Sequence, residues 1–355
     1  MRADLEIEDP LSGHPRYSTQ RYLSEGSFGF VVLATENASG KPVAIKFLKR
    51  LEDRMTKNVE RELMNHSRLI HPHIVRFYEC FLTDKHLAIV MEYAAGGSLY
   101  SHVTANLGLG EDTSRFLFQQ LILALDYCHK MNISNRDIKL ENTLLESVES
   151  GRNPLIKICD FGYSIDDQSS LPKTKVGTPG YTAPEVLTSA RYDAKLADIW
   201  SAGVMLYTML CCSYPFEKKE DDPQDVRTQT KVMQRIMKAD YEWPSSKKVS
   251  KECKDLLSKI LVADPKRRIA IAEIQKHPWY QKALPKGLQL DTYNLHYVEL
   301  SRAAASSTDL AAAIKKVMQE ARGETETPMS TSGADSHMLH AYGSLEEDED
   351  FPSMY

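Results

Sequence analysis

Four residues of the types needed for phosphoryl transfer lie in two short stretches of the chain. The stretch ISNRDIKLEN holds Asp137, Lys139 and Asn142, and the stretch CDFG holds Asp160. An aspartate can accept or orient the proton of an attacking hydroxyl, and an ammonium group can neutralise a moving phosphoryl group. Carboxylate and amide oxygens are ligands that suit Mg²⁺. We therefore predict that Asp137 and Lys139 are catalytic and that Asn142 and Asp160 bind Mg²⁺.

A glycine-containing stretch near the start of the chain could enclose the phosphates of ATP. LSEGSFGFV runs from Leu23 to Val31 and contains Gly26 and Gly29, which lack a Cβ and so let backbone N–H groups approach a phosphate. Ser24 stands where the pattern G-x-G-x-x-G has its first glycine. Two glycines in a hairpin are usually turn residues, so this stretch by itself is a weak signal.

The next strand offers a lysine for the α- and β-phosphates. VAIK contains Ala44 and Lys46, although a lysine on a strand is most often a solvated surface charge. In the helical stretch that follows, Glu62 could hold the Lys46 ammonium by an ion pair. Glu60 is the rival carboxylate, but it lies about 200° away around the same helix. We expect Glu62 to be the partner.

The elements that must position these residues change in character near residues 93–97. Before this point, FGFVVLATE and KPVAIKFLK are strand-like runs separated by the turn signal NASGK, and LAIVMEY is a buried strand. KNVERELMNHSRL has helical spacing. After this point, TSRFLFQQLILALDYCHKM and DAKLADIWSAGVMLYTML are long helices, and the second is apolar on nearly every side. The sequence therefore predicts a small β-rich lobe followed by a larger helical lobe.

Composition limits the class of protein and its compartment. The chain has 355 residues, 42% of them hydrophobic, and its six cysteines form no C-x-x-C pair. This favours buried thiols in a reducing compartment over disulfides or a zinc site. We see no secretory signal, and no apolar run approaches the roughly 20 residues of a membrane span. We therefore expect a cytoplasmic protein, a nuclear protein or one found in both places.

The C-terminal part differs in charge from the rest of the chain. Residues 324–355 hold eight acidic residues and no lysine or arginine, so their formal charge is −8. The whole chain has a net charge of −5, so the remainder carries +3. A mildly basic body with an acidic tail does not favour a nucleic-acid partner. The tail is rich in Ser, Thr, Gly and Glu, which predicts disorder. Before it, STDLAAAIKKVMQEAR predicts an amphipathic helix at about 307–322.

From about Tyr22 to Pro285 the chain resembles a eukaryotic serine/threonine protein kinase. Within that superfamily it is most similar to the plant and green-algal sucrose-non-fermenting-related kinases of subfamily two. The resemblance rests on HPHIVRF, LAIVMEYAAGGSL, IKLENTLL, KICDFGYS, VGTPGYTAPEVL, YPFE and HPW. It implies an α+β, bilobal protein-kinase fold with a β-rich N-lobe, a helical C-lobe and a C-terminal regulatory helix. It also implies ATP and Mg²⁺ as cofactors.

The expected domain organisation combines this resemblance with the change in composition. The predicted parts are an N-terminal extension at 1–20, a kinase domain at 21–284 with an N-lobe at 21–93 and a C-lobe at 94–284, a regulatory extension at 285–323, and an acidic tail at 324–355.

The resemblance implies further site residues. Asp198 would brace the backbone of the catalytic loop, and Arg268 would pair with Glu185 in support of the fold. Met91 would be the gatekeeper of the adenine pocket, next to a hinge of backbone hydrogen-bonding groups. The predicted ATP-binding residues are therefore Leu23, Ser24, Gly26, Gly29, Val31, Ala44, Lys46, Glu62, Met91, Glu92 and Ala94.

Phosphorylation between the CDFG and APE motifs is expected to control activity. Thr174 aligns with the serine that the resembling family uses, and Ser170 is the second site. Arg136 would bind the phosphate, whereas Ile165 stands where relatives often have a second basic residue. We expect an upstream kinase and a phosphatase as partners, and a smaller activation than a full basic cluster would give.

The substrate contacts implied by the resemblance are only partly present. Thr178 would contact Asp137 and Lys139 beside the substrate hydroxyl. Ser98 replaces a glutamate that receives a substrate arginine in many basophilic kinases. Glu141 remains to do part of that work, together with the acidic stretch EKKEDD. We expect a preference for basic protein substrates that is weaker than in the family.

Asn135 departs from the catalytic-loop pattern, which has histidine at this position. In the family the histidine ring packs against the phenylalanine of D-F-G and hydrogen-bonds nearby backbone. Asparagine keeps the hydrogen-bonding ability but loses packing area, at a cost on the order of 1–2 kcal/mol. Because the nucleotide, metal and proton-handling residues are intact, we predict an active enzyme.

The predicted activity is ATP-dependent transfer of the γ-phosphoryl group to serine or threonine hydroxyls of proteins, in stress or nutrient signalling. The alternative is a pseudokinase scaffold with weak or no turnover. A small-molecule or lipid kinase is disfavoured, because GTPGYTAPE looks like the peptide-binding segment of protein kinases. We expect no nucleic-acid partner and no membrane association.

Overall fold

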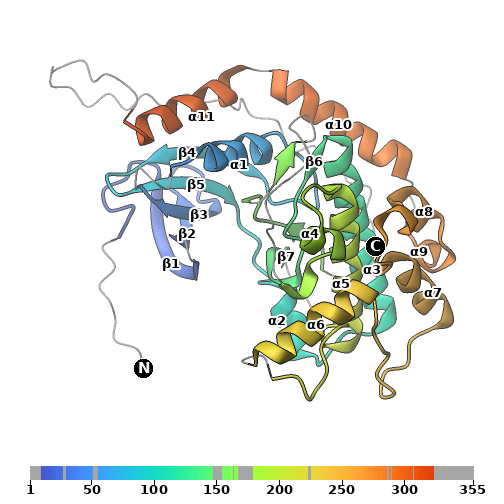
Figure 1. Cartoon of the computed structure of the whole chain (residues 1–355). Coiled ribbons are helices and arrows are strands. Elements are labelled where there is room, and N and C mark those ends of the chain that lie inside the picture. Colours follow the sequence, from blue (N-terminus) through green and yellow to red (C-terminus); the bar gives the residue numbers. More distant parts are fainter. Residues whose placement is uncertain are drawn as a thin grey trace, which may run out of the picture. The chain divides into compact units, whose positions relative to one another are not determined.

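The structure is a computed structural model, and it divides into two compact units. It describes residues 9–26, 29–50, 55–146, 154–162, 164–166, 179–222, 225–285, 288, 290–306 and 308–323. The first unit comprises residues 1–69, 75–93 and 301–355, and the second comprises residues 70–74 and 94–300. Each unit is described by itself below, with the element labels of Figure 1.

The first unit is built on an antiparallel sheet of five strands in the order β1-β2-β3-β5-β4. Its elements are β1 (Tyr17–Gly26), β2 (Gly29–Glu36), β3 (Pro42–Lys49), α1 (Lys57–Ser67), β4 (Phe77–Leu82), β5 (His86–Glu92) and α11 (Thr308–Ala321). The hairpin predicted from the turn signal NASGK is present, because Thr35 of β2 pairs with Pro42 of β3.

The two faces of this sheet carry separate hydrophobic clusters. Strand residues alternate between the faces, so Ile45 and Phe47 of β3 point into one cluster and Leu48 belongs to the other. The first cluster also contains Leu11, which is 3% exposed although it precedes the sheet. The N-terminal segment is thus part of the core, and β1 begins at Tyr17, inside the stretch assigned above to an N-terminal extension.

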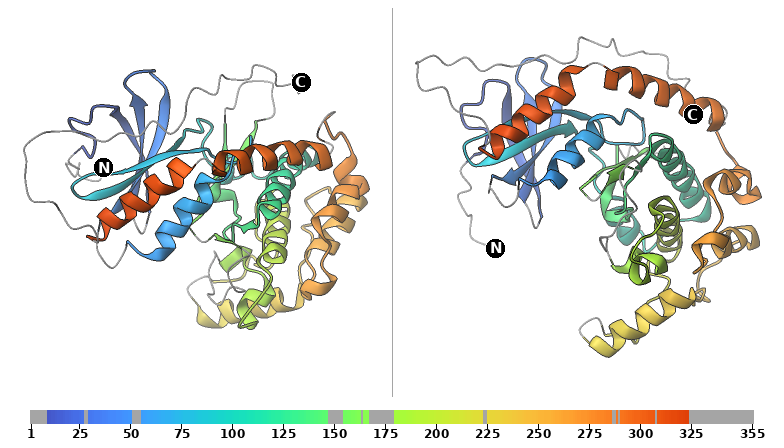
Figure 2. Two further views of the ribbon diagram at one scale, coloured as in Figure 1. Left: turned by 90° about the horizontal axis from the view of Figure 1, so that it is seen from above. Right: turned by 45° about the horizontal axis from the view of Figure 1, so that its top comes forward.

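The helices α1 and α11 cover the second face. They contact each other, and α11 also contacts β4, as both views in Figure 2 indicate. Ile314 and Met318 of α11 are fully buried in the same cluster as Leu63 of α1. The predicted amphipathic helix therefore buries its apolar face on the sheet and α1.

The second unit is mainly helical. Its long helices α3 and α5 contact each other and form its centre. Its elements are α2 (Leu99–Ala105), α3 (Glu111–Lys130), β6 (Ile133–Ser134), η1 (Leu140–Asn142), β7 (Thr143–Leu145), β8 (Ile156–Ile158), β9 (Ile165–Asp166), η2 (Pro179–Tyr181), α4 (Pro184–Thr188), α5 (Ala194–Cys211), α6 (Val226–Lys238), α7 (Lys251–Ile260), η3 (Pro265–Arg267), α8 (Ile271–Lys276), α9 (Pro278–Gln281) and most of α10 (Leu290–Ser306).

The helix α5 is buried on nearly every side, as its composition predicts. Asp193 caps its N-terminus by accepting hydrogen bonds from the backbone N–H groups of Lys195 and Leu196. Gly203 lies so close to α7 that a Cβ there would be 2.4 Å from Ile260 Cγ2. A larger residue here would force Ile260 or its helix to shift, because real Cβ atoms essentially never approach so closely.

A bidentate ion pair supports the second unit. Arg268 Nη1 and Nη2 donate to Glu185 Oε1 and Oε2 at 2.6 and 2.8 Å, and both side chains are buried. The guanidinium also lies 5.1 Å from the ring centroid of Trp200. This ion pair joins α4 to the residue that follows η3. It therefore supports the fold of the second unit.

The helix α10 was not predicted from the sequence, from which a helix was expected only at about 307–322 of the regulatory extension. The face that α10 buries explains this, because two of its residues are polar. Asn294 and Ser301 are 0% exposed and Val298 is 3% exposed. Asn294 Nδ2 donates to the Leu123 carbonyl of α3 at 2.9 Å and to Asp126 Oδ2 at 2.7 Å. A helix held by a buried amide does not show the apolar periodicity that sequence reasoning requires.

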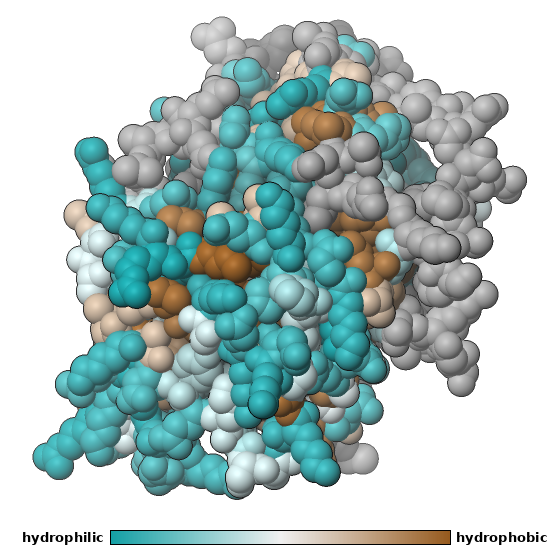
Figure 3. Space-filling view, turned by 90° about the vertical axis from the view of Figure 1, so that its right-hand side faces the viewer, coloured by the Kyte–Doolittle hydropathy of each residue, from teal (hydrophilic) through white to brown (hydrophobic). Residues whose placement is uncertain are grey.

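One face of the molecule is mostly polar where its residues are described. Figure 3 shows a face on which hydrophilic residues predominate and hydrophobic ones form small patches. Within the described residues, no helix is both long and apolar enough to cross a membrane.

The predicted fold class is confirmed by these two units. A five-stranded antiparallel sheet covered by helices, together with a mainly helical unit, is the arrangement that the resemblance implies.

Candidate active site

The first unit pairs Lys46 with Glu62. Lys46 lies on β3 between two buried neighbours, so its side chain points to the face covered by α1. Its Nζ donates to Glu62 Oε1 at 3.2 Å, and the two side chains are 24% and 13% exposed. Glu60 instead faces the end of α11, where it pairs with Arg322. Helix geometry separates the two carboxylates, and the packing of α11 gives the second one its own partner.

The residues predicted to hold the nucleotide share this face of the sheet. Val31 lies opposite Lys46 in the β2–β3 register, and Met91 lies opposite Ala44 in the β3–β5 register. All four are half-buried. Cross-strand neighbours on one face form a continuous surface. The apolar side chains of Val31, Ala44 and Met91 therefore lie beside the ammonium group of Lys46 on one surface.

Gly29 is required by close packing of the strands. A Cβ at Gly29 would be 1.8 Å from the carbonyl oxygen of Phe47 on β3. Gly26 pairs with Gly29 at the end of the hairpin, and Ser24 pairs with Val31. Leu23 and Ser24 both lie on β1, where Leu23 is half-buried and Ser24 is exposed.

Two of the predicted ATP-binding residues lie at the end of β5, because Glu92 is its last residue and Ala94 comes just after it. The backbone N–H of Glu92 donates to the Arg76 carbonyl at 2.9 Å, and its carboxylate accepts from the Arg76 N–H at 3.0 Å. Met91 packs against the cluster that contains Ile314 and Met318 of α11. Ala94 belongs to the second unit and is 7% exposed.

In the second unit, Asp137 is held by two cationic or amide donors. Lys139 Nζ donates to Asp137 Oδ2 at 2.7 Å, and Asn142 Nδ2 donates to the same oxygen at 2.8 Å. The Asp137 side chain is 3% exposed. The carboxylate is therefore fixed in orientation and kept from bulk water, as a group that orients a hydroxyl should be.

Asp198 braces the backbone of this loop. It is 1% exposed and accepts from the N–H groups of Asn135 and Arg136 at 3.1 and 2.8 Å. His129 Nε2 lies 3.0 Å from Asp198 Oδ2. Arg136 has φ +68°, which is unfavourable for a non-glycine residue, so the loop needs such support.

Asn142 and Asp160 are brought to adjacent segments. The carbonyl of Asn142 accepts from the N–H of Cys159 at 2.9 Å, which places the residue before Asp160 against the catalytic loop. Among the described residues, the Asn142 side chain makes its two hydrogen bonds through its NH₂ group, so its amide oxygen could serve a metal as a ligand. Asp160 Oδ1 accepts from the Gly162 N–H at 3.1 Å.

These oxygens fit a Mg²⁺ ion that is bound mainly through phosphates. Mg²⁺ is usually held by one or two protein oxygens together with substrate phosphates and water. Among the described residues, no three His, Cys, Asp or Glu side chains gather as a preformed metal cluster. One amide oxygen and one carboxylate are consistent with such a site.

The side chain of Asn135 makes two hydrogen bonds to the backbone of other residues in the candidate site. Its Oδ1 accepts from the Asp137 N–H at 3.0 Å, and its Nδ2 donates to the Asp160 carbonyl at 3.0 Å. The residue is 1% exposed. Both ends of the amide are therefore satisfied by residues of the candidate site.

Tyr192 is a site residue that the sequence did not reveal. Arg136 Nε donates to the Tyr192 hydroxyl at 3.0 Å, and the guanidinium lies 5.8 Å from the ring centroid. Burial raises the pKa of Tyr192, so it stays a neutral phenol. No motif connects these two positions in the sequence, since Tyr192 lies in the segment before α5.

Among the described residues, one buried oxygen of Glu141 has no hydrogen-bond partner. Its Oε1 accepts from the Tyr214 hydroxyl at 3.4 Å, and its Oε2 is the buried, unpartnered atom. Burial, with Asp221 nearby, raises the pKa of Glu217. Ser98, which replaces the family's glutamate, caps α2 by accepting from the Ser101 N–H at 3.2 Å.

Several predicted residues lie outside the described part of the chain. These are Ser170, Thr174, Thr178 and the acidic tail at 324–355. Ile165 is described only through its backbone, which pairs with Ser134 in the β6–β9 ladder.

Comparisons with known proteins identify the family of this chain. A protein kinase domain matches residues 17–280, so the chain belongs to the protein kinases. Serine/threonine-protein kinase SAPK3 of Oryza sativa subsp. indica is 44% identical over 336 residues, which cover 94% of this chain and 96% of that protein. Serine/threonine-protein kinase SRK2C of Arabidopsis thaliana is 49% identical over 271 residues, or 76% of this chain and 77% of that protein. Serine/threonine-protein kinase SRK2A of Physcomitrium patens is 48% identical over 279 residues, or 78% of each.

Within the protein kinases the chain is a member of the sucrose-non-fermenting-related kinases, subfamily two. It is a protein serine/threonine kinase. The predicted family and the predicted protein kinase activity are both confirmed. None of these relatives favours the pseudokinase alternative.

Proposed function

We propose that this kinase transfers the γ-phosphoryl group of Mg²⁺-bound ATP to protein hydroxyls through Asp137, Lys139, Asn142 and Asp160. The observation that carries the proposal is the convergence of Lys139 and Asn142 on one buried oxygen of Asp137. A carboxylate held in this way can orient the hydroxyl of a substrate serine or threonine. The sequence order and the family membership support the same assignment.

The reaction forms one bond and breaks another. The substrate hydroxyl oxygen bonds to the γ-phosphorus, while the bond from that phosphorus to the β–γ bridging oxygen breaks and releases ADP. Asp137 orients the hydroxyl and takes its proton, and Lys139 stabilises the charge on the phosphoryl group being transferred. Bound Mg²⁺ neutralises charge on the phosphates, and Asn142 and Asp160 would hold it.

The first unit is proposed to bind the nucleotide. Lys46, oriented by Glu62, contacts the α- and β-phosphates, and the half-buried apolar residues on the same sheet face receive the adenine ring. Met91 is the gatekeeper in this proposal. The same set includes Leu23, Ser24, Gly26, Gly29, Val31, Ala44 and Glu92 of the first unit, and Ala94 of the second.

Substrate preference is proposed to depend on Glu141. A buried carboxylate oxygen without a partner is costly unless a cation or donor reaches it, so an arginine or lysine of the substrate is a suitable occupant. Thr178 is proposed to lie beside the acceptor hydroxyl. The substrates in this proposal are basic protein segments.

Regulation is proposed to act through phosphorylation of Thr174, and secondarily Ser170, by an upstream kinase and reversal by a phosphatase. Arg136 would bind the phosphate. We further propose a role in stress or nutrient signalling, in the cytoplasm, the nucleus or both. The free state of all six cysteines supports a reducing compartment.

The roles can be tested by turnover of a generic basic protein with the purified full chain. Asp137→Asn, Lys46→Met and Asp160→Asn should each lower kcat/KM by at least about 100-fold with normal thermal unfolding, because each removes a group that acts on the transferred phosphate or hydroxyl. The controls are Asp84→Asn and Lys57→Met, which change exposed residues of the same types. Activity near the wild-type level in Asp137→Asn would remove the proposal.

A further inference from the structure

The glycine-containing hairpin of the first unit carries a serine where the pattern G-x-G-x-x-G has its first glycine. This residue, Ser24, lies on β1 and is exposed, and Arg21, three positions earlier, is exposed as well. In the described sheet β1 is an edge strand, since it is hydrogen-bonded to β2 alone, as Figure 1 shows. A basic side chain and a hydroxyl are therefore presented together on an extended, accessible segment.

A bulge in β1 brings these two side chains to one face of the sheet. The β1–β2 register pairs Arg21 with Leu33 and Ser24 with Val31, so three steps along β1 match two steps along β2. Residues three apart on a regular strand point to opposite faces. Leu33 and Val31 are two apart on β2 and point to one face, and their partners on β1 point to it with them.

This face is the one that carries Lys46. Ser24 pairs with Val31 and Val31 pairs with Lys46, so the three residues form one row across β1, β2 and β3. Two strand spacings, or roughly 10 Å, separate the Cα atoms of Ser24 and Lys46. In the proposed function the phosphates of ATP lie in this space, between the hairpin and the Lys46 ammonium. A phosphate on Ser24 would occupy the same space.

The same spacing of arginine and hydroxyl occurs at two further places among the described residues. Thr19 follows Arg16 by three residues, but both are half-buried and the Thr19 hydroxyl donates to a carboxylate at 2.6 Å. Thr230 follows Arg227 by three residues, but it lies inside α6, where its hydroxyl donates to a helix carbonyl at 3.0 Å. Of the three pairs, the one at Ser24 alone combines an extended backbone with two exposed side chains.

We propose that Ser24 is phosphorylated by a second copy of this kinase, which recognises Arg21, and that the phosphate on Ser24 then blocks ATP binding. The inference rests on the proposed function, because it uses the proposed preference of Glu141 for a basic residue of the substrate. The second copy is the enzyme, and the edge strand β1 of the first copy is the substrate.

The active site of the second copy has a place for such an arginine. Glu141 lies in the same short turn as Asn142, which contacts Asp137, and one of its buried oxygens has no partner among the described residues. A cation that enters close to the accepted hydroxyl can pair with that oxygen. In the free chain Arg21 donates to the Tyr93 hydroxyl at 2.9 Å in an exposed hydrogen bond, which must open first.

The transfer forms one bond and breaks one. The Ser24 hydroxyl oxygen bonds to the γ-phosphorus of ATP held by the second copy. The bond from that phosphorus to the β–γ bridging oxygen breaks and releases ADP. The hydroxyl proton passes to Asp137 of the second copy. Two copies are needed, because the hairpin that carries Ser24 is proposed to enclose the ATP of its own chain.

The phosphate would act on the nucleotide site through its charge. It adds about −1.5 to −2 charge and three acceptor oxygens on the face that carries Lys46. It would therefore compete with ATP for the Lys46 ammonium and repel the phosphates of ATP. This effect is opposite in sign to the activation proposed for Thr174.

The test uses as acceptor the tagged full chain with Asp137→Asn, incubated with the wild-type chain and ATP. The acceptor is recovered by its tag, and its phosphates are mapped by mass spectrometry. Ser24 should be phosphorylated, and Arg21→Gln in the acceptor should lower the initial rate at Ser24 by about 10-fold, because a charged partner of Glu141 is lost. The matched control is Arg227→Gln, which changes another exposed arginine and should leave the rate unchanged.

A readout without turnover measures the effect on the nucleotide. After ATP is removed, the phosphorylated acceptor should bind a non-hydrolysable ATP analogue with Mg²⁺ about 10-fold more weakly than the untreated acceptor. An acceptor that also carries Ser24→Ala should bind the analogue equally well before and after the same treatment. This comparison within one variant separates the phosphate on Ser24 from phosphates elsewhere in the chain.

The outcomes are distinct. A wild-type chain that phosphorylates a generic basic protein but not Ser24 would overturn the inference. An unchanged rate for Arg21→Gln, or a loss of affinity that persists with Ser24→Ala, would overturn it as well. If Asp137→Asn does not fold, Asp160→Asn serves as the acceptor in its place. A wild-type chain that phosphorylates neither protein would contradict the proposed function itself, and this inference with it.

Discussion

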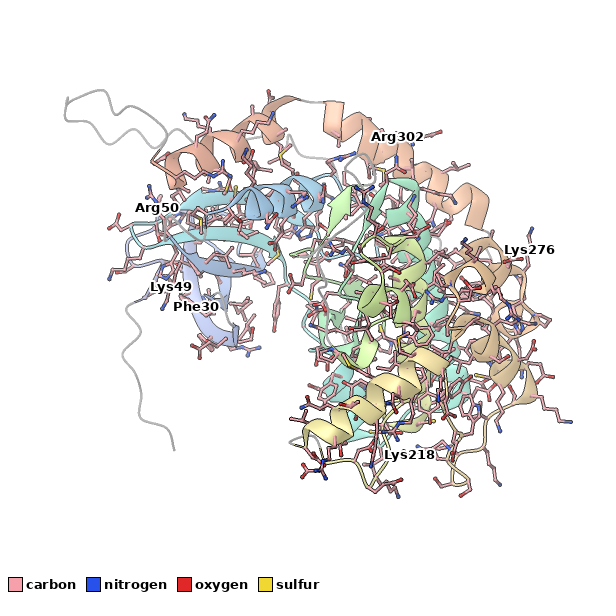
Figure 4. All side chains as sticks on the ribbon, viewed as in Figure 1. Phe30, Lys49, Arg50, Lys218, Lys276 and Arg302 are labelled. Atoms are coloured by element: carbon pink, nitrogen blue, oxygen red, sulfur yellow. The ribbon has the colours of Figure 1, made fainter. Side chains whose placement is uncertain are left out.

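Arg322 and Glu60 form an ion pair in which Arg322 Nη2 lies 2.6 Å from Glu60 Oε2. The same guanidinium donates through Nε to the Met55 carbonyl at 2.8 Å, just before α1 begins. Arg50, labelled in Figure 4, adds a third tie by donating to the Glu320 carbonyl at 2.9 Å. The end of α11 is thus fastened to the start of the helix that carries Glu62 and, through Arg50, to the residue that follows β3.

We predict that Glu60→Gln and Arg322→Gln each lower kcat/KM by about 2–5-fold and destabilise the first unit slightly. The pair is 16% and 26% exposed, so a double-mutant cycle should give a coupling of only about 0.5–1 kcal/mol. The swap Glu60→Arg with Arg322→Glu should recover part of the loss. Lys316→Gln, on the exposed side of α11, is the control. Strict additivity of the two single variants would show that the pair does not couple.

Removal of α11 should weaken the kinase. Truncation after residue 306 uncovers the face that buries Ile314 and Met318, each worth about 1.5–3 kcal/mol when fully buried. Melting temperature should fall by at least about 4 °C, and activity should fall with it because α1 loses its packing partner. Truncation after residue 323 keeps α11 and should change neither property. Equal behaviour of both truncated chains would mean that α11 does not support the active arrangement.

Phosphorylation of Thr174 should raise activity. A phosphate adds about −1.5 to −2 charge and three acceptor oxygens, which Arg136 can bind bidentately. Thr174→Ala should therefore lower the activity of phosphorylated enzyme by about 10-fold, with a smaller effect for Ser170→Ala. Tyr192→Phe should reduce the gain, because it removes the hydroxyl that orients the Arg136 guanidinium.

The measurement for this prediction is mass-spectrometric mapping combined with activity before and after phosphatase treatment. The Thr174→Ala, Ser170→Ala double variant should be insensitive to phosphatase. Full activity of that double variant in its unphosphorylated form would show that the segment is not the switch.

Two buried histidines should make stability depend on pH. Burial lowers the pKa of His73 from 6.5 to about 3, and the pKa of His71 is lowered well below 6.5 for the same reason. Below pH 6.5 the unfolded chain binds protons that the folded chain does not, so stability falls as pH drops from 6.5 toward 3. Each group contributes about 1.4 kcal/mol per pH unit in this window.

His73→Asn should remove one of these contributions. Its amide can still donate to the Ile156 carbonyl, which His73 Nδ1 now contacts at 3.3 Å. Between pH 7.5 and 5.5, urea unfolding should show that the variant loses about 1.4 kcal/mol less stability than wild type. His102→Asn, on α2 and not buried, is the control. Identical losses for His73→Asn and wild type would contradict the assignment.

The sequence alone determined the class of the enzyme and most of its local structure. Asp137, Lys139 and Asn142 lie within six residues, so the covalent chain itself brings their side chains together at Asp137 Oδ2. Strand alternation likewise places Lys46 on the face opposite to Ile45 and Phe47. Short-range geometry of this kind follows from residue type and spacing.

The tertiary structure alone decided the contacts between distant segments. Glu60 and Arg322 are separated by most of the chain, and packing of α11 on α1 brings them together. The helix α10 is held by a buried asparagine that breaks the apolar pattern, and Asn135 meets Asp160 only because two loops fold against each other. Such pairs depend on how whole elements pack, and no spacing rule in the sequence records that packing.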